Sequence, residues 1–263
     1  MPSPLVIAHR GNSSVVPENT VAALVSAARA GADLFEIDLQ MTTDGVGVVF
    51  HDHPLGRTAA ASGLLRELDL EAVQGLEVGS WFDPAWAGTP VPVWDDVLAV
   101  LERCPATGLL LEVSGPWRDT ALAEVLTSVV TAGLGDRVIV QSFSLASLHT
   151  AQRVAPELSR GLLTATWPQI APLERTASDP DSVIDACLAV GARWCNPIGS
   201  VLTEHPDAVP VIHRQGLQTM VWTLNEPAEW LVASAATVDG IITDRPDRLV
   251  GWLAGHGSAA QEA

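Results

Sequence analysis

The stretch LVIAHRGNSSVVPENTVAALVSAARAGADLFEIDL, at residues 5–39, carries the pattern that decides the fold. An apolar run at 5–9 is followed by a helical pattern at 17–30 and by a second apolar run at 32–39. Short apolar runs that alternate with helices are typical of β/α units and a parallel sheet. Gly31 directly follows the helical pattern, as expected just past the end of a helix.

The same alternation continues along the rest of the chain. An extended run at 46–50 follows the turn Thr43-Asp44-Gly45. Further strands are predicted at 108–113, 137–142, 161–164, 193–196, 218–223 and 240–243. Further helices are predicted at 95–103, 120–132, 145–154, 181–190, 208–215, 228–235 and 246–254. If 46–50 extends the second strand unit, the pattern predicts an α/β fold of the (β/α)8 TIM-barrel type, for which about 250 residues are typical.

Residues 53–92 interrupt this alternation. They are rich in Gly, Pro and Trp, and they contain only a weak helical pattern at 68–74. Because a structureless loop of this length is unusual in a compact domain, we expect a small insertion after the second strand that packs over one end of the barrel. No linker-like segment divides the chain, so one domain is expected over 1–263, with a frayed tail at 255–263.

Composition limits the partners of the protein. The formal net charge is -17, which disfavours nucleic acid and anionic membrane surfaces. No apolar run reaches the roughly 18 residues that span a bilayer, and no amphipathic anchor is evident, so stable membrane anchoring is not expected. The start of the chain lacks the pattern of a signal peptide. The three cysteines of the protein have no metal-ligand spacing, so we expect a cytoplasmic protein with reduced thiols.

Carboxylates stand at the ends of two predicted strands, where β/α barrels carry their chemistry. Glu36 and Asp38 are two residues apart on one strand and therefore point the same way. Buried carboxylates repel one another, and Mg²⁺ or Ca²⁺ is a natural partner for their oxygens. Glu112, at the end of another strand, is a candidate third ligand. Spacing alone equally favours carboxylate–arginine pairs that hold the barrel mouth together.

Two histidines and an arginine also follow apolar runs. His9 and His51 stand at separate strand ends, and next to carboxylates they suit general acid–base catalysis near neutral pH. Taken singly, each histidine fits a structural role better than a catalytic one. Arg10 offers a planar set of donors that matches a phosphate, or it forms a salt bridge between elements.

Short motifs occur in order up to Asp52, and matching segments follow later in the chain. The first series is His9-Arg10-Gly11, Pro17-Glu18-Asn19-Thr20, Gly31-Ala32-Asp33 with Glu36-x-Asp38, Thr43-Asp44-Gly45 and His51-Asp52. The later segments are Val91-Pro92, Gln141-Ser142-Phe143, Val221-Trp222-Thr223-Leu224-Asn225 and Asp239-Gly240-Ile241-Ile242-Thr243-Asp244-Arg245-Pro246. Together they resemble the glycerophosphodiester phosphodiesterase family, from residue 5 to about residue 250.

This resemblance implies a barrel with a small insertion and a phosphoric diester hydrolase of glycerol and lipid metabolism. It implies one divalent cation, Mg²⁺ or Ca²⁺, on Glu36, Asp38 and Glu112. It further implies His9 and His51 as the acid–base pair, with Arg10 on the phosphate. Trp222 would line the glycerol side of the pocket, although ordinary core packing also explains a tryptophan there.

One position departs from the family pattern. Where the family usually has Glu-x-Lys, with the lysine on the phosphate, this chain has Glu112-Val113-Ser114. Ser114 can donate one hydrogen bond to the substrate but carries no charge. Arg57 and Arg118 are candidates to replace the missing charge.

The expected reaction is hydrolysis of a glycerophosphodiester to glycerol 3-phosphate and an alcohol. Two alternatives stay open at this point. One is a related phosphodiesterase that acts on lysophospholipids or another head group. The other is a barrel that binds phosphodiesters without turning them over.

Overall fold

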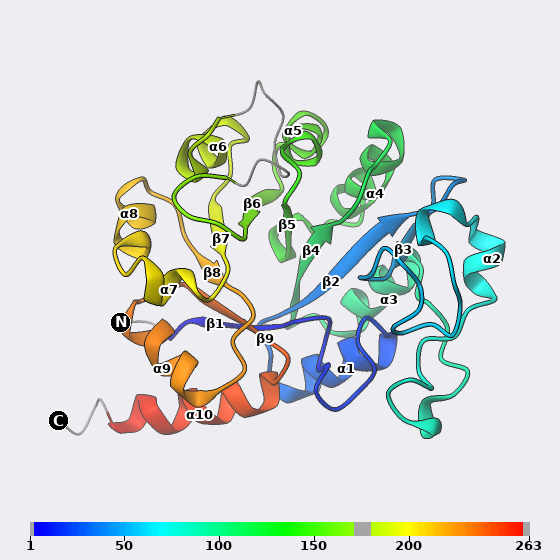
Figure 1. Cartoon of the computed structure of the whole chain (residues 1–263), viewed down its shortest axis with the longest axis horizontal. Helices are drawn as coiled ribbons and strands as arrows, with labels where there is room; N and C mark the ends of the chain where they lie inside the picture. The colour runs from blue at the N-terminus through cyan, green and yellow to red at the C-terminus, as the bar shows by residue number, and fades with distance from the viewer. Residues whose placement is uncertain (1–2, 171–179, 260–263) are drawn as a thin grey trace.

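The computed structural model describes residues 3–170 and 180–259, in which strands alternate with helices (Figure 1). The strands are β1 (Leu5–Ala8), β2 (Leu34–Met41), β3 (Gly47–Val49), β4 (Gly108–Val113), β5 (Val138–Ser142), β6 (Ser159–Thr164), β7 (Trp194–Pro197), β8 (Met220–Val221) and β9 (Gly240–Thr243). The helices are α1 (Val21–Ala30), α2 (Leu70–Gln74), α3 (Trp94–Arg103), α4 (Asp119–Thr131), α5 (Leu145–Val154), α6 (Val183–Ala189), α7 (Val201–Glu204), α8 (Ala208–Arg214), α9 (Pro227–Ala235) and α10 (Pro246–Ala259). The strands occupy the centre of the molecule, and the helices lie outside them.

Parallel pairing runs in the order β7-β6-β5-β4-β2-β1-β9-β8. The two ends of this series meet through isolated bridges from Trp194 to Gln218 and from Ile198 to Trp222, so the eight parallel strands form a nearly closed barrel. β3 lies off this series and pairs antiparallel with β2. The predicted TIM-barrel fold is therefore confirmed, with 46–50 extending the second strand unit.

Alternation along the strands divides the barrel interior into an apolar layer and a polar layer. One hydrophobic cluster contains Ile7, Leu34, Leu110, Met220 and Ile242. Because side chains two residues apart share a face, the next layer toward the carboxyl ends of these strands holds His9, Glu36, Glu112, Trp222 and Asp244. The apolar layer fills the floor of the barrel, and the polar layer lies at its carboxyl-terminal mouth, where such barrels carry their active sites.

Residues 53–92 follow β3 and build a hydrophobic cluster of their own. Short 3₁₀ helices at Leu65–Glu67 and Pro84–Trp86 flank α2, which corresponds to the helix predicted at 68–74. Leu55, Leu65 and Val73 are buried in this cluster together with Val48 of β3. In Figure 1 this segment lies beside β3, on the right of the barrel. It is the insertion that the sequence predicts after the second strand.

The helices differ from the prediction most clearly at α1, α7 and α10. α1 begins at Val21 rather than at residue 17, because Asn19 has a φ of 55° and the Thr20 side chain caps the helix by accepting from the Ala23 amide. α7 was not predicted. α10 continues to Ala259, so the expectation of a frayed tail from residue 255 is wrong as far as Ala259, and residues 260–263 lie outside the described part of the chain.

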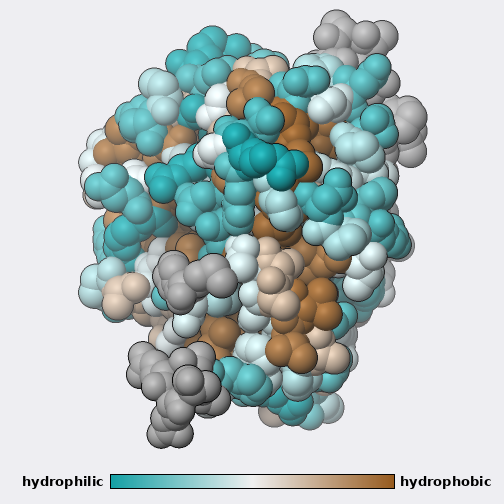
Figure 2. Space-filling view, turned by 90° about the vertical axis from the view of Figure 1, so that its left-hand side faces the viewer, coloured by the Kyte–Doolittle hydropathy of each residue, from teal (hydrophilic) through white to brown (hydrophobic). Residues whose placement is uncertain are grey.

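Among the described residues, no helix has both the length and the apolar character needed to cross a membrane. α9 carries the exposed side chains Leu231 and Val232. It lies on the side of the molecule shown in Figure 2, where hydrophobic patches stand among hydrophilic residues.

Candidate active site

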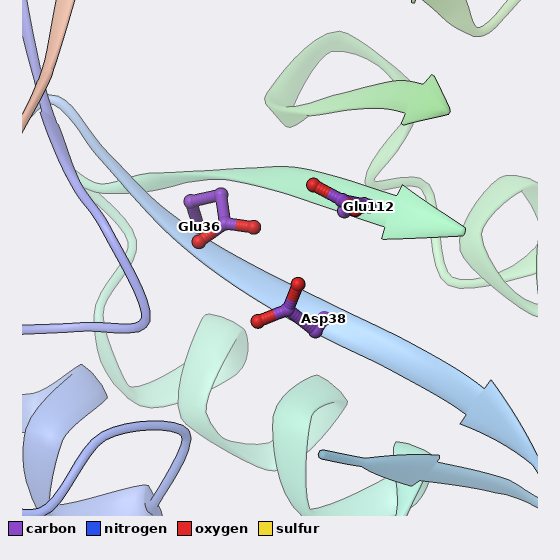
Figure 3. Close-up of side chains that lie close together, drawn as sticks. All are labelled: Glu36, Asp38 and Glu112. Carbon is purple, nitrogen blue, oxygen red and sulfur yellow. The ribbon is translucent and has the colours of Figure 1, made fainter. Parts of the chain in front are cut away.

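Three carboxylates meet at the mouth of the barrel. Glu36 and Asp38 come from β2 and Glu112 from the adjacent β4, and the register places Asp38 opposite Glu112. Each residue offers an oxygen within 4.8 Å of those of the other two, and Figure 3 shows the three side chains gathered over the two strands. The strand alternation that predicted a shared face for Glu36 and Asp38 therefore also gathers the predicted third member, Glu112.

The carboxylate cluster is electrostatically poised to take up a cation. Burial, together with the charges of Asp38 and Glu112, raises the pKa of Glu36 well above its usual range. Burial and Asp38 raise the pKa of Glu112 to about 8. Glu36 Oε1 is buried and has no hydrogen-bond partner among the described residues. A hard divalent cation fits this set, because it would neutralise the repulsion and occupy the unpaired oxygen.

The raised pKa of Glu112 predicts the pH dependence of stability in the metal-free protein. In the folded state the Glu112 carboxyl keeps its proton up to about pH 8, whereas in the unfolded chain it loses this proton above its ordinary pKa of 4.5. The stability that this group contributes is complete below about pH 4.5 and is lost as the pH rises through about 8. The melting temperature in a chelator should therefore fall between about pH 6 and about pH 8.5. Mg²⁺ or Ca²⁺ at ~100 times its Kd should raise it by roughly 5–10 °C; a rise with pH in the chelator would contradict this assignment.

Arg10 lies in the turn that follows strand β1 and contacts the carboxylate cluster. Its backbone has a φ of 57°, and the following Gly11 passes α1 so closely that a Cβ there would lie 2.6 Å from the Ala23 carbonyl carbon. This turn directs the Arg10 amide to Glu36 Oε2, at 2.8 Å. The guanidinium lies 2.8 Å from Glu18 Oε1 and 3.2 Å from Asp38 Oδ2.

These charges decide the state of Arg10. Burial lowers the pKa of the guanidinium, but Asp38 and Glu18 outweigh burial and raise that pKa above its ordinary value. Asn19 completes the support by donating to Asp38 Oδ2 over 2.8 Å. Arg10 is thus a permanent cation at the edge of the cluster and forms the ion pairs that the salt-bridge interpretation anticipates.

His9 is held by a carboxylate on the neighbouring strand end. Its Nδ1 lies 2.7 Å from Asp244 Oδ1, and Asp244 also accepts from Asn225 and Ser13. Burial raises the pKa of Asp244, but the hydrogen bond and charge of His9, together with the hydrogen bonds from Asn225 and Ser13, outweigh burial and lower the pKa to about 2. Asp244 is therefore ionised at neutral pH and accepts the Nδ1 proton of His9, which leaves Nε2 outside this pair.

His51 has the same arrangement in the loop that follows β3. Its Nδ1 lies 2.6 Å from Asp52 Oδ1, and Arg57 binds Asp52 Oδ2 over 2.6 Å. Arg57 also pairs with Glu18, which links this group to Arg10. Gln40 Nε2 donates to the carbonyls of residues 50, 51 and 52 and so fixes the loop that carries the histidine.

A cavity of about 600 Å³ opens beside these groups, and its lining includes His51, Glu112, Ser114 and Phe143. Ser114 donates its hydroxyl hydrogen to Glu112 Oε1 over 2.8 Å. Trp222 packs edge-to-face on Phe143, with ring centroids 5.6 Å apart, and its indole donates to the Asn196 carbonyl. Trp222 is therefore next to a residue of the cavity lining but is not part of the lining itself.

The two arginines considered as replacements for the missing lysine lie in different places. Arg57 is next to the site, where Glu18 and Asp52 neutralise it. Arg118 instead donates to the Thr43 carbonyl and packs on the turn at 43–45, so it lies outside the cavity lining.

Sequence reasoning missed the supporting roles of Glu18, Asn19 and Asp244. Each stands in one of the family-like motifs, but none of them is expected from the sequence to have a role in the site. In the structure Thr20 caps α1, and the Asp244 carboxylate binds His9, Ser13 and Asn225. Motif membership was the available signal, since partners 235 positions apart leave no local pattern.

Comparisons with known proteins agree with this geometry. Residues 9–248 match the sequence profile of the glycerophosphoryl diester phosphodiesterase family. A glycerophosphodiester phosphodiesterase of Caldanaerobacter subterraneus is 31% identical over 94% of this chain and 96% of its own length. One from Bacillus subtilis is 31% identical over 92% of this chain and 84% of its own length.

Solved structures show the same fold. A phosphodiesterase from Oleispira antarctica, solved with sn-glycerol-3-phosphate, superposes with a TM-score of 0.81 at 24% identity, over 96% of this chain and 97% of its own. A glycerophosphodiester phosphodiesterase from Agrobacterium tumefaciens superposes with a TM-score of 0.75 at 27% identity, over 93% and 97%. The chain therefore belongs to the glycerophosphoryl diester phosphodiesterase family and is a phosphoric diester hydrolase.

Proposed function

We propose that this chain hydrolyses glycerophosphodiesters to glycerol 3-phosphate and an alcohol, with His9 and His51 as the acid–base pair. The observation that carries the proposal is that both histidines have a carboxylate on Nδ1 and adjoin one carboxylate cluster. The residue after His9 donates to Glu36, and His51 lines the same cavity as Glu112. This arrangement provides two proton-transfer groups beside a cation site.

Glu36, Asp38 and Glu112 are proposed to hold one Mg²⁺ or Ca²⁺. The unpaired Glu36 Oε1 and the raised pKa values of Glu36 and Glu112 support a site built for a hard cation. When bound, such a cation supplies Lewis-acid polarisation of a phosphate oxygen. Three carboxylates and one dication leave about one negative charge, which the adjacent Arg10 offsets so that an anionic phosphodiester can approach.

The two histidines move the protons. Ionised Asp244 and Asp52 keep the Nδ1 atoms protonated, so Nε2 is the working atom of each ring. One histidine takes the proton of the nucleophile, and the other protonates the leaving alcohol oxygen as the P–O bond breaks. The nucleophile is water or the neighbouring hydroxyl of the substrate; attack by the hydroxyl would form a cyclic phosphate, which a water molecule would then open to glycerol 3-phosphate.

Trp222 and Ser114 are proposed to shape substrate binding. Phe143, backed by Trp222, gives the cavity an apolar wall against which a glycerol carbon skeleton can pack. Ser114 already donates to Glu112, so it contributes little charge compensation to a phosphate. The product bound to the Oleispira antarctica relative supports glycerol 3-phosphate as the product class.

Product analysis by ³¹P NMR tests this function. The purified chain, with Mg²⁺ or Ca²⁺, is given glycerophosphodiesters with several head groups and, separately, a lysophospholipid. Glycerol 3-phosphate should appear from the glycerophosphodiesters. Turnover of the lysophospholipid alone would replace this proposal by the lysophospholipid alternative, and binding without any product would favour a non-catalytic barrel.

Asp244 is expected to act by positioning His9. Replacing Asp244 by asparagine should lower kcat by roughly 10²-fold while KM stays nearly constant, because the tautomer of His9 is no longer fixed. Ser13→Ala is the matched control and should leave kcat almost unchanged, because the Ser13 hydroxyl lies closer to the His9 carbonyl (2.8 Å) than to Asp244 Oδ1 (3.2 Å) and does not touch the His9 ring. An unchanged kcat in Asp244→Asn would show that the pair is only structural.

A further inference from the structure

The cationic groups around the carboxylate cluster are already committed to carboxylates. Arg10 is bound by Glu18 and Asp38, and Arg57 by Glu18 and Asp52. The Ser114 hydroxyl hydrogen is directed to Glu112. Their charges are thus paired, and an anionic phosphodiester that enters the cavity would gain from a further donor on the cavity wall, beside the cation and Arg10.

His53 provides such a donor. It lines the cavity together with His51, Glu112 and Ser114. Among the residues that the structure describes, no hydrogen bond or ion pair engages its ring, and Leu65 contacts only its backbone. Its nitrogens are therefore available to a ligand in the cavity.

The fold determines where this ring lies. Gly115 has a φ of 70°, and a Cβ built on it would lie 3.5 Å from His53 Cε1 and 4.0 Å from Nδ1. The imidazole thus rests against bare backbone directly after Ser114. Its own backbone is fixed, because Gln40 donates to the Asp52 carbonyl and the Leu65 amide donates to the His53 carbonyl.

We propose that His53 is a substrate-binding residue that donates an imidazole N–H to a non-bridging phosphate oxygen of the phosphodiester. The inference rests on the proposed function and adds a residue to it. A neutral imidazole has one N–H donor and a protonated one has two, so either form can donate to a phosphate oxygen. His53 supplies a hydrogen-bond donor on the cavity wall, whereas the Ser114 hydroxyl hydrogen is already donated to Glu112.

Steady-state kinetics on His53→Ala and His53→Gln test the assignment. Because a hydrogen bond to a charged group is lost, KM for the glycerophosphodiester should rise about tenfold in His53→Ala, with kcat within roughly twofold. Glutamine keeps an N–H donor and should restore part of the loss. Adding Ser114→Lys to His53→Ala should lower KM again, because the lysine would bring a charge to the neighbouring wall. His149→Ala, an exposed histidine on α5, is the matched control and should change neither constant.

The outcomes separate this proposal from the proposed function. If the wild type turns over and KM is unchanged in His53→Ala, the role of His53 is overturned while the hydrolase proposal stands. If the wild type shows no turnover, the hydrolase proposal fails. In that case, calorimetric titration with glycerol 3-phosphate in the presence of Ca²⁺ still tests the role of His53. The proposed role requires that His53→Ala binds glycerol 3-phosphate more weakly than the wild type does.

Discussion

Replacing His51 by alanine is expected to lower kcat for a glycerophosphodiester by about 10²–10⁴-fold, the usual contribution of general acid–base catalysis. His9→Ala should cause a loss of the same order. Neither change should unfold the protein, because both side chains lie at the rim of the barrel rather than in its apolar layer, and the His51 side chain is 41% exposed. Melting curves recorded beside the kinetics check this point.

His213→Ala is the matched control for the histidine variants. His213 also pairs with a carboxylate, at 2.9 Å from Asp239 Oδ2. Asp239 precedes β9, whereas Asp244 follows it, so this pair lies at the opposite end of the same strand. Its removal should leave kcat within roughly twofold, because a group outside the site takes no part in proton transfer. Wild-type kcat in both His9→Ala and His51→Ala would contradict the acid–base assignment.

Glu112→Gln is expected to abolish cation binding while making the metal-free protein more stable. The substitution keeps the shape of the side chain and leaves an oxygen for the Ser114 hydroxyl, but it removes one of three repelling charges. Losing the Lewis acid should lower kcat/KM by roughly 10³-fold or more. The metal-free melting temperature at about pH 8 should rise by roughly 2–4 °C for each kcal/mol of repulsion removed.

The opposite signs of these two effects distinguish a metal site from a structural network. If Glu112 served mainly to hold the barrel mouth together, its neutralisation would lower stability and leave cation binding alone. Calorimetric titration with Ca²⁺ and melting curves in a chelator measure both quantities on the same variant. Loss of stability without loss of cation binding would contradict the proposed ligand set.

Much of the fold and part of the site could be predicted from local patterns. The two-residue spacing of Glu36 and Asp38 fixes their shared face, and the strand that ends near Glu112 is recognisable from its apolar run. The parallel register of β2 and β4 then brings all three together. Strand alternation likewise puts His9 two residues beyond the buried Ile7.

The supporting contacts could not be predicted from the sequence. Asp244 meets His9, and Glu18 meets Arg57, only because the barrel closes and the 53–92 segment folds back on the mouth. The start of α1 was misplaced for a related reason. Arg10 and Asn19 both take positive φ values, which are held by tertiary contacts with Glu36 and Asp38 rather than by local preference.

Turnover of a glycerophosphodiester by the wild-type chain, measured in a chelator and again after Mg²⁺ or Ca²⁺ is restored, tests the central claim most directly. The account predicts that glycerol 3-phosphate forms only when the cation is present and that activity returns fully on its addition. Full activity in the chelator would contradict a cation site on Glu36, Asp38 and Glu112 as part of the catalytic machinery.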